Sequence, residues 1–350
     1  MDSSAVNVNV TVDDFDTVLV YDDQAQWTTP DPSSGDFNGN DPQYLRGTYH
    51  LTDRVGAAVG LNFTGPALYI YGHKGPRFGS YRIELDSATI ESSARADAAS
   101  DGSVLLYGSS NLTYGNHQLR LTNLGEGFLL DYIQYTFQAA PAGATIRNET
   151  YQEDNSAFSF TGEWGHNTSP AFSGGGTTYT NEDRATATLK FKGSAIYVLG
   201  DIKNDHRGYG IKLDGDAEQF LNGTSGCGGD FGLTCEQQVP ILKFLGSNLD
   251  DSEHTITITN YAGVNNSFFD LDSVVVAVPS TYGPRQLADS GSPFVLPSGT
   301  PTSGTTTDGT PRSTSSSGSN VSNQNSAALL ALNPLVLFCF LLLPLLHRKL

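Results

Sequence analysis

The sequence predicts an all-β protein: two antiparallel β-sandwich domains in tandem, then a disordered stalk and one hydrophobic helix at the C-terminus. Three observations lead to this prediction. Glycine is frequent, with 38 of 350 residues, and only 16% of residues are charged, a composition typical of strands joined by tight turns. Apolar and polar residues alternate with period two. Long segments of the chain also repeat.

The repeat sets the number of domains. Residues 61–72 match residues 189–200 at an offset of 128, and residues 117–123 match residues 254–260 at an offset of 137. Each copy holds several short alternating runs that end in Gly, Asn or Asp, which indicates strands joined by hairpins. We predict an N-terminal arm, a first sandwich, a linker, a second sandwich, a stalk, a hydrophobic segment and a basic tail, in this order: 1–9, 10–138, 139–144, 145–281, 282–326, 327–346 and 347–350.

The C-terminal segments predict a membrane anchor. Ser, Thr, Gly and Pro dominate residues 290–326, a composition that cannot form a core and predicts a flexible stalk. Residues 327–346 carry no charge and are long enough to cross a bilayer as a helix. The basic residues that follow favour a retained span, whereas small residues before a polar spacer also fit a signal for a GPI anchor.

The features that bear on secretion disagree. No signal peptide is visible in residues 1–16, so we expect either a missing first exon or, as the alternative, a tail-anchored protein with its domains in the cytosol. Sequons for N-glycosylation favour secretion and extracellular domains at the cell surface. We also predict a disulfide between Cys227 and Cys235 in a Gly-rich insertion. The sequons lie at Asn9, Asn62, Asn111, Asn148, Asn167, Asn222, Asn265 and Asn320.

Charge and motifs exclude several classes of function. The formal net charge is −18, and without a basic stripe this excludes nucleic acid as a partner. The sequence contains no nucleophile elbow, no His-Glu-x-x-His motif, no phosphate-binding loop and no Cys-x-x-Cys. His117 and His254 occupy matching positions, and we interpret them as residues that stabilise turns rather than catalyse.

Acidic residues in the final strand of each copy are candidates for catalysis. Asp131 stands there in the first copy, and Asp270 and Asp272 stand there in the second. Side chains two positions apart on a strand share a face at about 7 Å, a separation that suits a glycosidase pair. The alternative, which we favour, is a solvated face or a bond to a neighbouring turn. A structural calcium ion held by such carboxylates is a further option, and no other cofactor is expected.

The loops after residues 72 and 200 are the candidate binding sites. They are cationic and flanked by glycine in an otherwise acidic protein, and binding residues concentrate on such loops. Arginine can donate to sugar hydroxyls, and tyrosine or tryptophan can stack on a sugar face. Core packing and solvated turns are the alternatives. The candidates are Trp27, Tyr49, His73, Lys74 and Arg77 in the first copy, and Trp164, Tyr179, Lys203, Asp205, His206 and Arg207 in the second.

The order of motifs resembles a known family. A Trp-containing segment precedes Gly-Thr-Tyr-His, Phe-x-Gly-x-x-Leu-Tyr-Ile-Tyr-Gly, Gly-x-Tyr-x-Ile-x-Leu-Asp and Gly-x-His-x-Leu-x-Leu-Thr-Asn. The pattern is similar to the galactose-binding-domain-like jelly rolls that occur in tandem in many basidiomycete cell-surface proteins, often with a Ser/Thr-rich stalk and one C-terminal span. The resemblance covers nearly all of residues 10–281. It implies the fold and, by analogy alone, glycan binding.

These features lead us to expect a membrane-anchored cell-surface glycoprotein that binds cell-wall or extracellular glycan without catalysis. Two linked copies would raise avidity if both can bind at once. One alternative is a carbohydrate-active hydrolase that uses strand or loop carboxylates. The other is a structural or adhesion protein that binds another protein.

Overall fold

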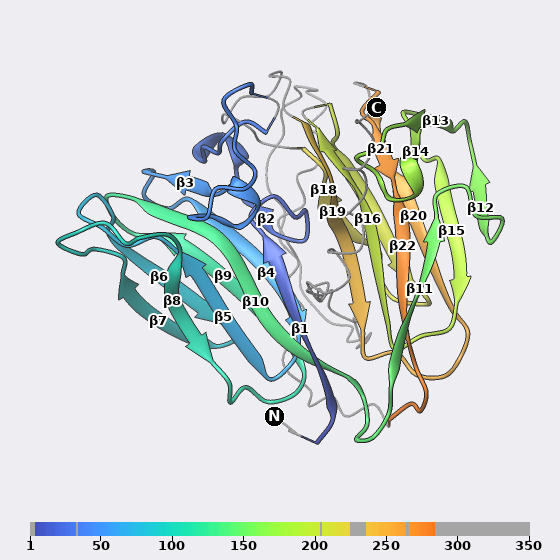
Figure 1. Ribbon diagram of the computed structural model, residues 1–350, viewed down its shortest axis with the longest axis horizontal. Coiled ribbons are helices and arrows are strands. Elements are labelled where there is room, and N and C mark those ends of the chain that lie inside the picture. Colours follow the sequence, from blue (N-terminus) through green and yellow to red (C-terminus); the bar gives the residue numbers. More distant parts are fainter. Residues whose placement is uncertain (1–3, 33, 204, 225–235, 264–265, 284–350) are drawn as a thin grey trace, which may run out of the picture.

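The computed structural model describes residues 4–32, 34–203, 205–224, 236–263 and 266–283 (Figure 1). Within these ranges the regular structure is strands and three short 3₁₀ turns, so the predicted all-β class is confirmed. No helix found there has the length and apolar character needed to cross a membrane. Several predictions lie outside the described residues: most of the stalk, the hydrophobic segment, the basic tail, Cys227, Cys235, Asn265 and Asn320.

The strands follow one another along the whole described chain. The first half of the chain contains β1 (Val6–Asp13), β2 (Val20–Tyr21), β3 (His50–Thr52), β4 (Ala58–Thr64), β5 (Ala67–Gly72), β6 (Ser80–Leu85), β7 (Ala88–Ser93), β8 (Val104–Ser109), β9 (Asn116–Asn123) and β10 (Phe128–Ala140). The second half contains β11 (Ile146–Gln152), β12 (Phe158–Thr161), β13 (Gly165–Thr168), β14 (Gly176–Thr180), β15 (Thr186–Phe191), β16 (Ala195–Lys203), β17 (Gly208–Leu213), β18 (Gln219–Asn222), β19 (Glu236–Ser247), β20 (His254–Asn260), β21 (Phe269–Leu271) and β22 (Ser273–Pro279). The 3₁₀ turns are η1 (Gln24–Gln26), η2 (Leu45–Gly47) and η3 (Ser173–Gly175).

The order of strand pairing in the first half recurs in the second. The sheets of the first half run β1-β10-β5-β8, with β3 also paired to β10, and β2-β4-β9-β6-β7. Those of the second half run β11-β22-β16-β19 and β12-β15-β20-β17-β18, with β13-β14-β21 as a small third sheet. All these pairs are antiparallel, and the two sets of sheets lie side by side (Figure 1).

The predicted domain bounds remain predictions, but the predicted N-terminal arm needs correction. β1 begins at Val6 and pairs with β10 as far as Ala140, so part of residues 1–9 is strand, and the strand β10 enters the predicted linker. The reason is that the alternation of apolar and polar side chains already begins at Val6, which makes these residues suitable for an outer strand.

The alternation predicted for β5 is present. Leu68 and Ile70 are 0% exposed in the core, whereas Tyr69 and Tyr71 are half-buried on the opposite face. The matching strand β16 differs, because Tyr197, which corresponds to Tyr69 in the repeat, is only 3% exposed.

The first half shares its hydrophobic core with the second half. Six residues of β16, β19 and β22 belong to the same buried cluster as the core of the first half: Ala195, Tyr197, Leu242, Leu245, Val275 and Ala277. The other face of these strands contributes to a separate core inside the second half. Hydrogen bonds add to the junction, since Thr17 N–H donates to Leu242 O at 3.1 Å and the Thr17 hydroxyl lies 2.6 Å from that of Tyr209.

The paired histidines stabilise turns, as predicted. His117 Nδ1 lies 2.6 Å from Asp86 Oδ2, and His254 Nδ1 lies 2.7 Å from Asp214 Oδ2. Both aspartates sit in hairpin turns at positive φ, 54° and 53°, a conformation that Asp tolerates better than most residues. The other ring nitrogen of each histidine faces a backbone carbonyl.

The shared core leads to a prediction on stability. Tyr197→Ala removes a buried ring between the halves, and we expect the free energy of unfolding to fall by about 3–5 kcal/mol, measured by urea denaturation of the full chain. Tyr197→Phe is the matched control. The Tyr197 hydroxyl is buried without a hydrogen-bond partner in the described structure, so its removal should not destabilise the protein. Equal stability of the Ala variant and the wild type would contradict a shared core.

Candidate functional site

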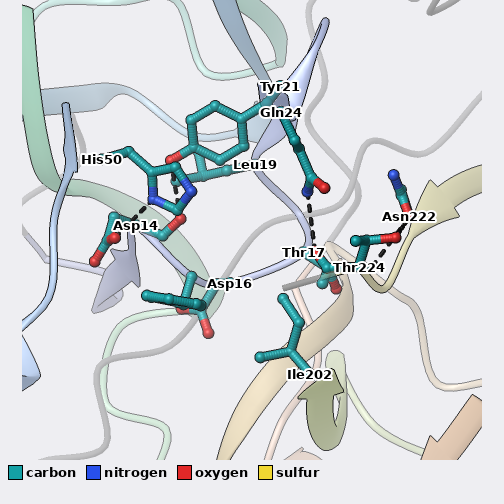
Figure 2. A pocket seen from close by; sticks show the side chains of 11 residues that line it. Asp14, Asp16, Thr17, Leu19, Tyr21, Gln24, His50, Ile202, Asn222 and Thr224 are labelled. Carbon is teal, nitrogen blue, oxygen red and sulfur yellow. Dashed lines mark hydrogen bonds and ion pairs between the residues drawn. The ribbon is translucent and has the colours of Figure 1, made fainter. Parts of the chain in front are cut away.

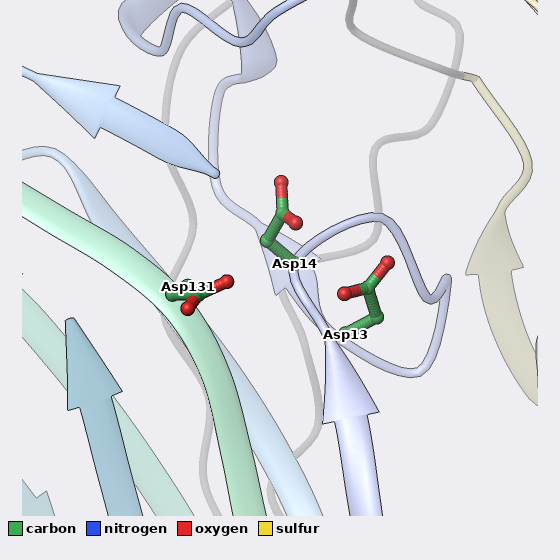
Figure 3. Close-up of side chains that lie close together, drawn as sticks. All are labelled: Asp13, Asp14 and Asp131. Carbon is green, nitrogen blue, oxygen red and sulfur yellow. The ribbon is translucent and has the colours of Figure 1, made fainter. Parts of the chain in front are cut away.

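Three buried aspartates gather where β1 meets β10 (Figure 3). Asp13 and Asp14 stand at the end of β1, and the antiparallel register that pairs Asp13 with Tyr132 brings Asp131 beside them. One carboxylate oxygen from each lies within 4.8 Å of the others, and all three residues are buried. We call Asp13, Asp14 and Asp131 the acidic cluster.

The acidic cluster holds the loop that leads into β3. Asp14 accepts a hydrogen bond from the Thr48 hydroxyl at 2.6 Å and lies 2.7 Å from His50 Nδ1. Asp131 accepts from Leu45 N–H at 3.0 Å and from the Ser103 hydroxyl. These bonds determine the path of residues 45–50.

Burial changes the protonation of the acidic cluster. Burial raises the pKa of Asp131 to about 7 and raises the pKa values of Asp13 and Asp14 well above their usual range. Burial also lowers the pKa of His50 to about 3, so this ring is neutral. The nearby cation is Arg46, whose guanidinium lies 3.6 Å from Asp13 Oδ2. One guanidinium cannot neutralise three ionised carboxylates.

The acidic cluster has the chemistry to hold a divalent cation. Both carboxylate oxygens of Asp13 are buried without a hydrogen-bond partner in the described part of the chain. Calcium takes six to eight oxygen ligands, and carboxylates supply one or two each. The calcium option from the sequence therefore fits Asp13, Asp14 and Asp131, of which only Asp131 was identified there.

Aromatic side chains form a rim beside this cluster. The Tyr44 ring centre lies 4.5 Å from that of Tyr49 and 6.0 Å from that of His73. The Arg77 guanidinium lies 5.6 Å from the centre of the Phe78 ring, and this ring lies 5.7 Å from that of His73. We call Tyr44, Tyr49, His73 and Arg77 the aromatic rim. Three of the four were candidates from the sequence.

The other candidates of the first copy lie apart from the aromatic rim or face inward. Trp27 is 1% exposed and packs against Tyr21 and Phe128, so its role is core packing. Lys74 is half-buried, and its backbone N–H donates to the Ser100 hydroxyl at 3.2 Å.

The equivalent loop of the second copy leads into a buried charge network, which we define as Asp201, His206, Lys243 and Asp270. His206 Nε2 lies 3.1 Å from Asp201. Lys243 is 0% exposed, and its Nζ lies 4.9 Å from the centre of the Phe269 ring. Among the described residues this Nζ has no hydrogen-bond partner.

The network shifts the pKa values of its members. Burial disfavours the charged imidazolium of His206, but the carboxylates of Asp201 and Asp205 together outweigh this effect and raise the pKa of His206. Burial lowers the pKa of Lys243, against the attraction of Asp201 and Asp270. Burial raises the pKa of Asp270 to about 7.

The remaining candidates of the second copy surround this network or lie elsewhere. Asp205 is exposed, with its carboxylate 2.9 Å from His206 Nδ1. Trp164 is half-buried, donates from Nε1 to a backbone carbonyl and packs 5.0 Å from Phe160. Three further candidates are half-buried: Tyr179, Lys203 and Arg207.

Asp270 and Asp272 are not on a solvated face, which corrects one of the two possibilities favoured from the sequence, whereas the other, a bond to a neighbouring turn, stays a prediction. Asp270 is 4% exposed and Asp272 0%. Asp270 accepts from the Thr177 hydroxyl at 3.0 Å, while Asp272 accepts from Ser273 at 3.0 Å. The single final strand of the first half is here divided into β21 and β22, which pair in different sheets. Because β21 and the start of β22 are buried, the carboxylates of Asp270 and Asp272 are enclosed by protein.

A small pocket lies between the two halves (Figure 2). The rings of Tyr21 and His50 stack there at 4.2 Å, and Gln24 donates to the backbone carbonyl of Thr224 at 2.9 Å. Ile202 of the second half closes the other side. The pocket depends on contacts between residues about 200 positions apart, and no local sequence pattern reports such contacts.

Sequence reasoning missed five residues of these sites: Asp13, Asp14, Tyr44, Asp201 and Lys243. The run of three carboxylates in Asp13-Asp14-Phe15-Asp16, at the end of an alternating strand, was the signal available for the acidic cluster. Tyr44 and Lys243 carried no pattern that distinguishes them from surface residues.

Most described sequons are accessible. Asn62 is half-buried, and the exposed asparagines are Asn9, Asn111, Asn148, Asn167 and Asn222.

Comparison with known proteins finds carbohydrate-active enzymes. No family model matches the chain. The chain is 23% identical over 251 residues to an A type blood alpha-D-galactosamine galactosaminidase of Flavonifractor plautii, covering 72% of this chain and 21% of that protein. It is 30% identical over 129 residues to an A type blood N-acetyl-alpha-D-galactosamine deacetylase of the same organism, covering 37% and 15%. The chain thus spans about a fifth or less of these curated relatives.

Two solved structures illustrate distant matches. A Paenibacillus xanthan lyase has a TM-score of 0.27 at 15% identity, over 74% of this chain and 25% of that one. A two-domain esterase active on acetylated mannans has a TM-score of 0.29 at 11% identity, over 37% and 36%. At these TM-scores neither structure informs the site of this chain.

The acidic cluster leads to a prediction on calcium and pH. The raised pKa of Asp131 means that the folded state holds a proton which the unfolded state releases, so this residue's stabilising contribution is complete below about pH 4 and is lost as pH rises towards 7. Calcium competes with these protons. We expect added calcium to raise the melting temperature more at pH 7 than at pH 5, measured by calorimetry after chelation and after calcium addition.

Asp131→Asn is the matched variant for this experiment. The amide keeps one hydrogen-bond acceptor and removes the charge, so the calcium effect at pH 7 should shrink or disappear. If neither chelation nor added calcium changes the melting temperature at pH 7, then protons and Arg46, rather than a metal ion, neutralise the acidic cluster.

Proposed function

We propose that this chain is a carbohydrate-active protein whose aromatic rim binds sugar. The aromatic rim is the observation that carries the proposal: three rings lie together at one end of the first half, and the Arg77 guanidinium reaches them through the Phe78 ring. The half-buried tyrosines offer faces on which the apolar side of a pyranose can stack, and exposed Arg77 offers donors for its hydroxyls. The relatives, both named for galactosamine chemistry, support an amino sugar as the ligand class.

The acidic cluster holds the loop that carries the tyrosines of the aromatic rim in one conformation. Asp131 holds the backbone at Leu45 and Asp14 holds Thr48, and these two contacts bracket most of the segment between Tyr44 and Tyr49. A loop held in its binding conformation loses little entropy when a ligand arrives. The cluster therefore acts on binding through position rather than through contact with sugar.

Catalysis is the second candidate, and the comparisons favour it over binding alone, because both curated relatives are named as enzymes. The charge network is the matching feature of this chain. Asp270, with its pKa raised to about 7, has the acidity that a general acid needs near neutral pH. His206 and Asp201 lie beside it as further proton carriers.

The cellular context that we propose is the cell surface, with the C-terminal segment as anchor, N-glycans on the exposed sequons and a disulfide between Cys227 and Cys235. Five exposed sequon asparagines support this context. The resemblance to fungal surface proteins belongs to the same proposal.

Substitutions in the aromatic rim test carbohydrate binding. Tyr44→Ala and Tyr49→Ala each remove a stacking face, and we expect about a tenfold loss of affinity for galactosamine-terminated or N-acetylgalactosamine-terminated oligosaccharides. Isothermal calorimetry of the full chain in detergent measures it. Tyr114→Phe, far along the chain from the rim, is the control and should bind like wild type. Binding that survives both rim substitutions would contradict the rim as the site.

Incubation with the same oligosaccharides tests catalysis. If the charge network is catalytic, the wild type releases free sugar or acetate, and Asp270→Asn lowers the rate about a hundredfold or more. Asp272→Asn serves as the matched comparison, since Asp272 is buried outside the network. Mass spectrometry of the products measures the rate. No product from the wild type would exclude the catalytic candidate while leaving sugar binding intact.

A further inference from the structure

The outer face of the sheet β12-β15-β20-β17-β18 carries an uncharged row that crosses all five strands. The register places Thr161 opposite Thr186, Thr186 opposite Thr259, Thr259 opposite Gly210 and Gly210 opposite Phe220. Neighbouring strands lie about 4.8 Å apart, so the row extends over about 19 Å.

Aromatic rings stand at the open end of this row. Phe220, on the edge strand β18, is 57% exposed. Its ring centre lies 5.1 Å from that of Tyr261, and the Arg184 guanidinium lies 4.7 Å from the Tyr261 ring on the other side. The Tyr261 hydroxyl donates to Glu218 at 2.5 Å, and this hydrogen bond holds the ring in place. We call Phe220, Tyr261 and the row the sheet platform.

A glycine makes room for the platform. A Cβ atom at Gly210 would lie 2.7 Å from the Tyr261 ring and 2.2 Å from the Glu218 carboxylate. Any larger residue would therefore displace Tyr261. The absence of a side chain at Gly210 lets the tyrosine ring rest against the strand and extend the flat surface towards Phe220.

The first half carries charges at the matching positions. The strand register aligns Arg82 and Glu91 with Gly210 and Phe220, and these two residues form an ion pair at 2.8 Å. Arg120 pairs with Asp22 on the same sheet face. The same topology is thus compatible with an ordinary solvated surface of ion pairs. The fold does not require a row without charged residues in the second half.

We propose that the sheet platform binds a neutral polysaccharide chain. Phe220 would stack against a pyranose ring, supported by the neighbouring Tyr261 ring, and the threonine hydroxyls would exchange hydrogen bonds with sugar hydroxyls along the row. Charge supports this ligand: the five residues of the row are uncharged, the Glu218 carboxylate and the Arg184 guanidinium beside the row already contact Tyr261, and a neutral chain is not repelled by a protein with a net charge of −18. The inference rests on carbohydrate as the ligand class of the proposed function, but it uses another surface and another sugar.

Depletion binding to insoluble β-1,3-glucan and cellulose tests the sheet platform. The full chain is used in detergent, both native and after glycosidase treatment, because the sequon Asn222 lies two residues from Phe220 on the same strand. We expect wild type to bind one of the polymers, and Phe220→Ala and Tyr261→Ala each to weaken binding roughly tenfold. Phe220→Glu, the residue that the first half has at this register, should abolish binding without unfolding.

Controls separate this inference from the proposed function. Ile90→Ala removes an exposed apolar side chain from β7, the equivalent edge strand of the first half, and should leave polymer binding unchanged. Tyr44→Ala should also leave it unchanged. Polymer binding lost in Tyr44→Ala but kept in Phe220→Ala would overturn the platform and support the rim. Amino-sugar binding without any polymer binding by wild type would overturn the platform alone.

Discussion

The need to compensate buried carboxylates at the end of β1 is the constraint on which the rest of the structure depends. A carboxylate removed from water must find hydrogen bonds or a cation. Asp14 and Asp131 accept hydrogen bonds from the loop that carries the aromatic rim. Asp16 accepts hydrogen bonds from the backbone N–H groups of Asp13 and Leu242, one from each half of the chain. One physical requirement therefore both positions the candidate sugar site and joins the two halves.

The two halves repeat their pairing order but not the chemistry of their surfaces. The contact between a histidine and a turn aspartate is retained in both, because it holds a hairpin that each sheet needs. Other matching positions differ: the strand register aligns Leu106 of β8 with Lys243 of β19, and Glu91 with Phe220. The difference between Glu91 and Phe220 lies on an outer face, where no core has to form. Leu106 and Lys243 are both buried, so there the second half has a lysine where the first half has an apolar side chain.

Much of the fold and a part of the site could be predicted from the sequence. Period-two alternation correctly places Leu68 in the core. The glycine-flanked loop pointed to His73, whose ring lies 6.0 Å from that of Tyr44, and its role in binding stays a prediction. Tyr44 could not be found, because its contact with Tyr49 depends on a loop path that the distant Asp131 determines. Lys243 could not be found either, since a lysine in a strand is expected to reach solvent and is rarely fully buried.

The sequence by itself determined that the chain is made of strands, which face of each strand is apolar, and that one set of strands repeats another. Only the tertiary structure decided what packs against the other face of each strand, the one that does not point into the core of its own half. Tyr69 and Tyr197 are matching residues of the repeat, yet Tyr69 is half-buried while Tyr197 is 3% exposed in the core shared with the first half. The physical reason is that alternation records the two sides of a strand, whereas the packing of one sheet on another depends on contacts between residues far apart in the chain.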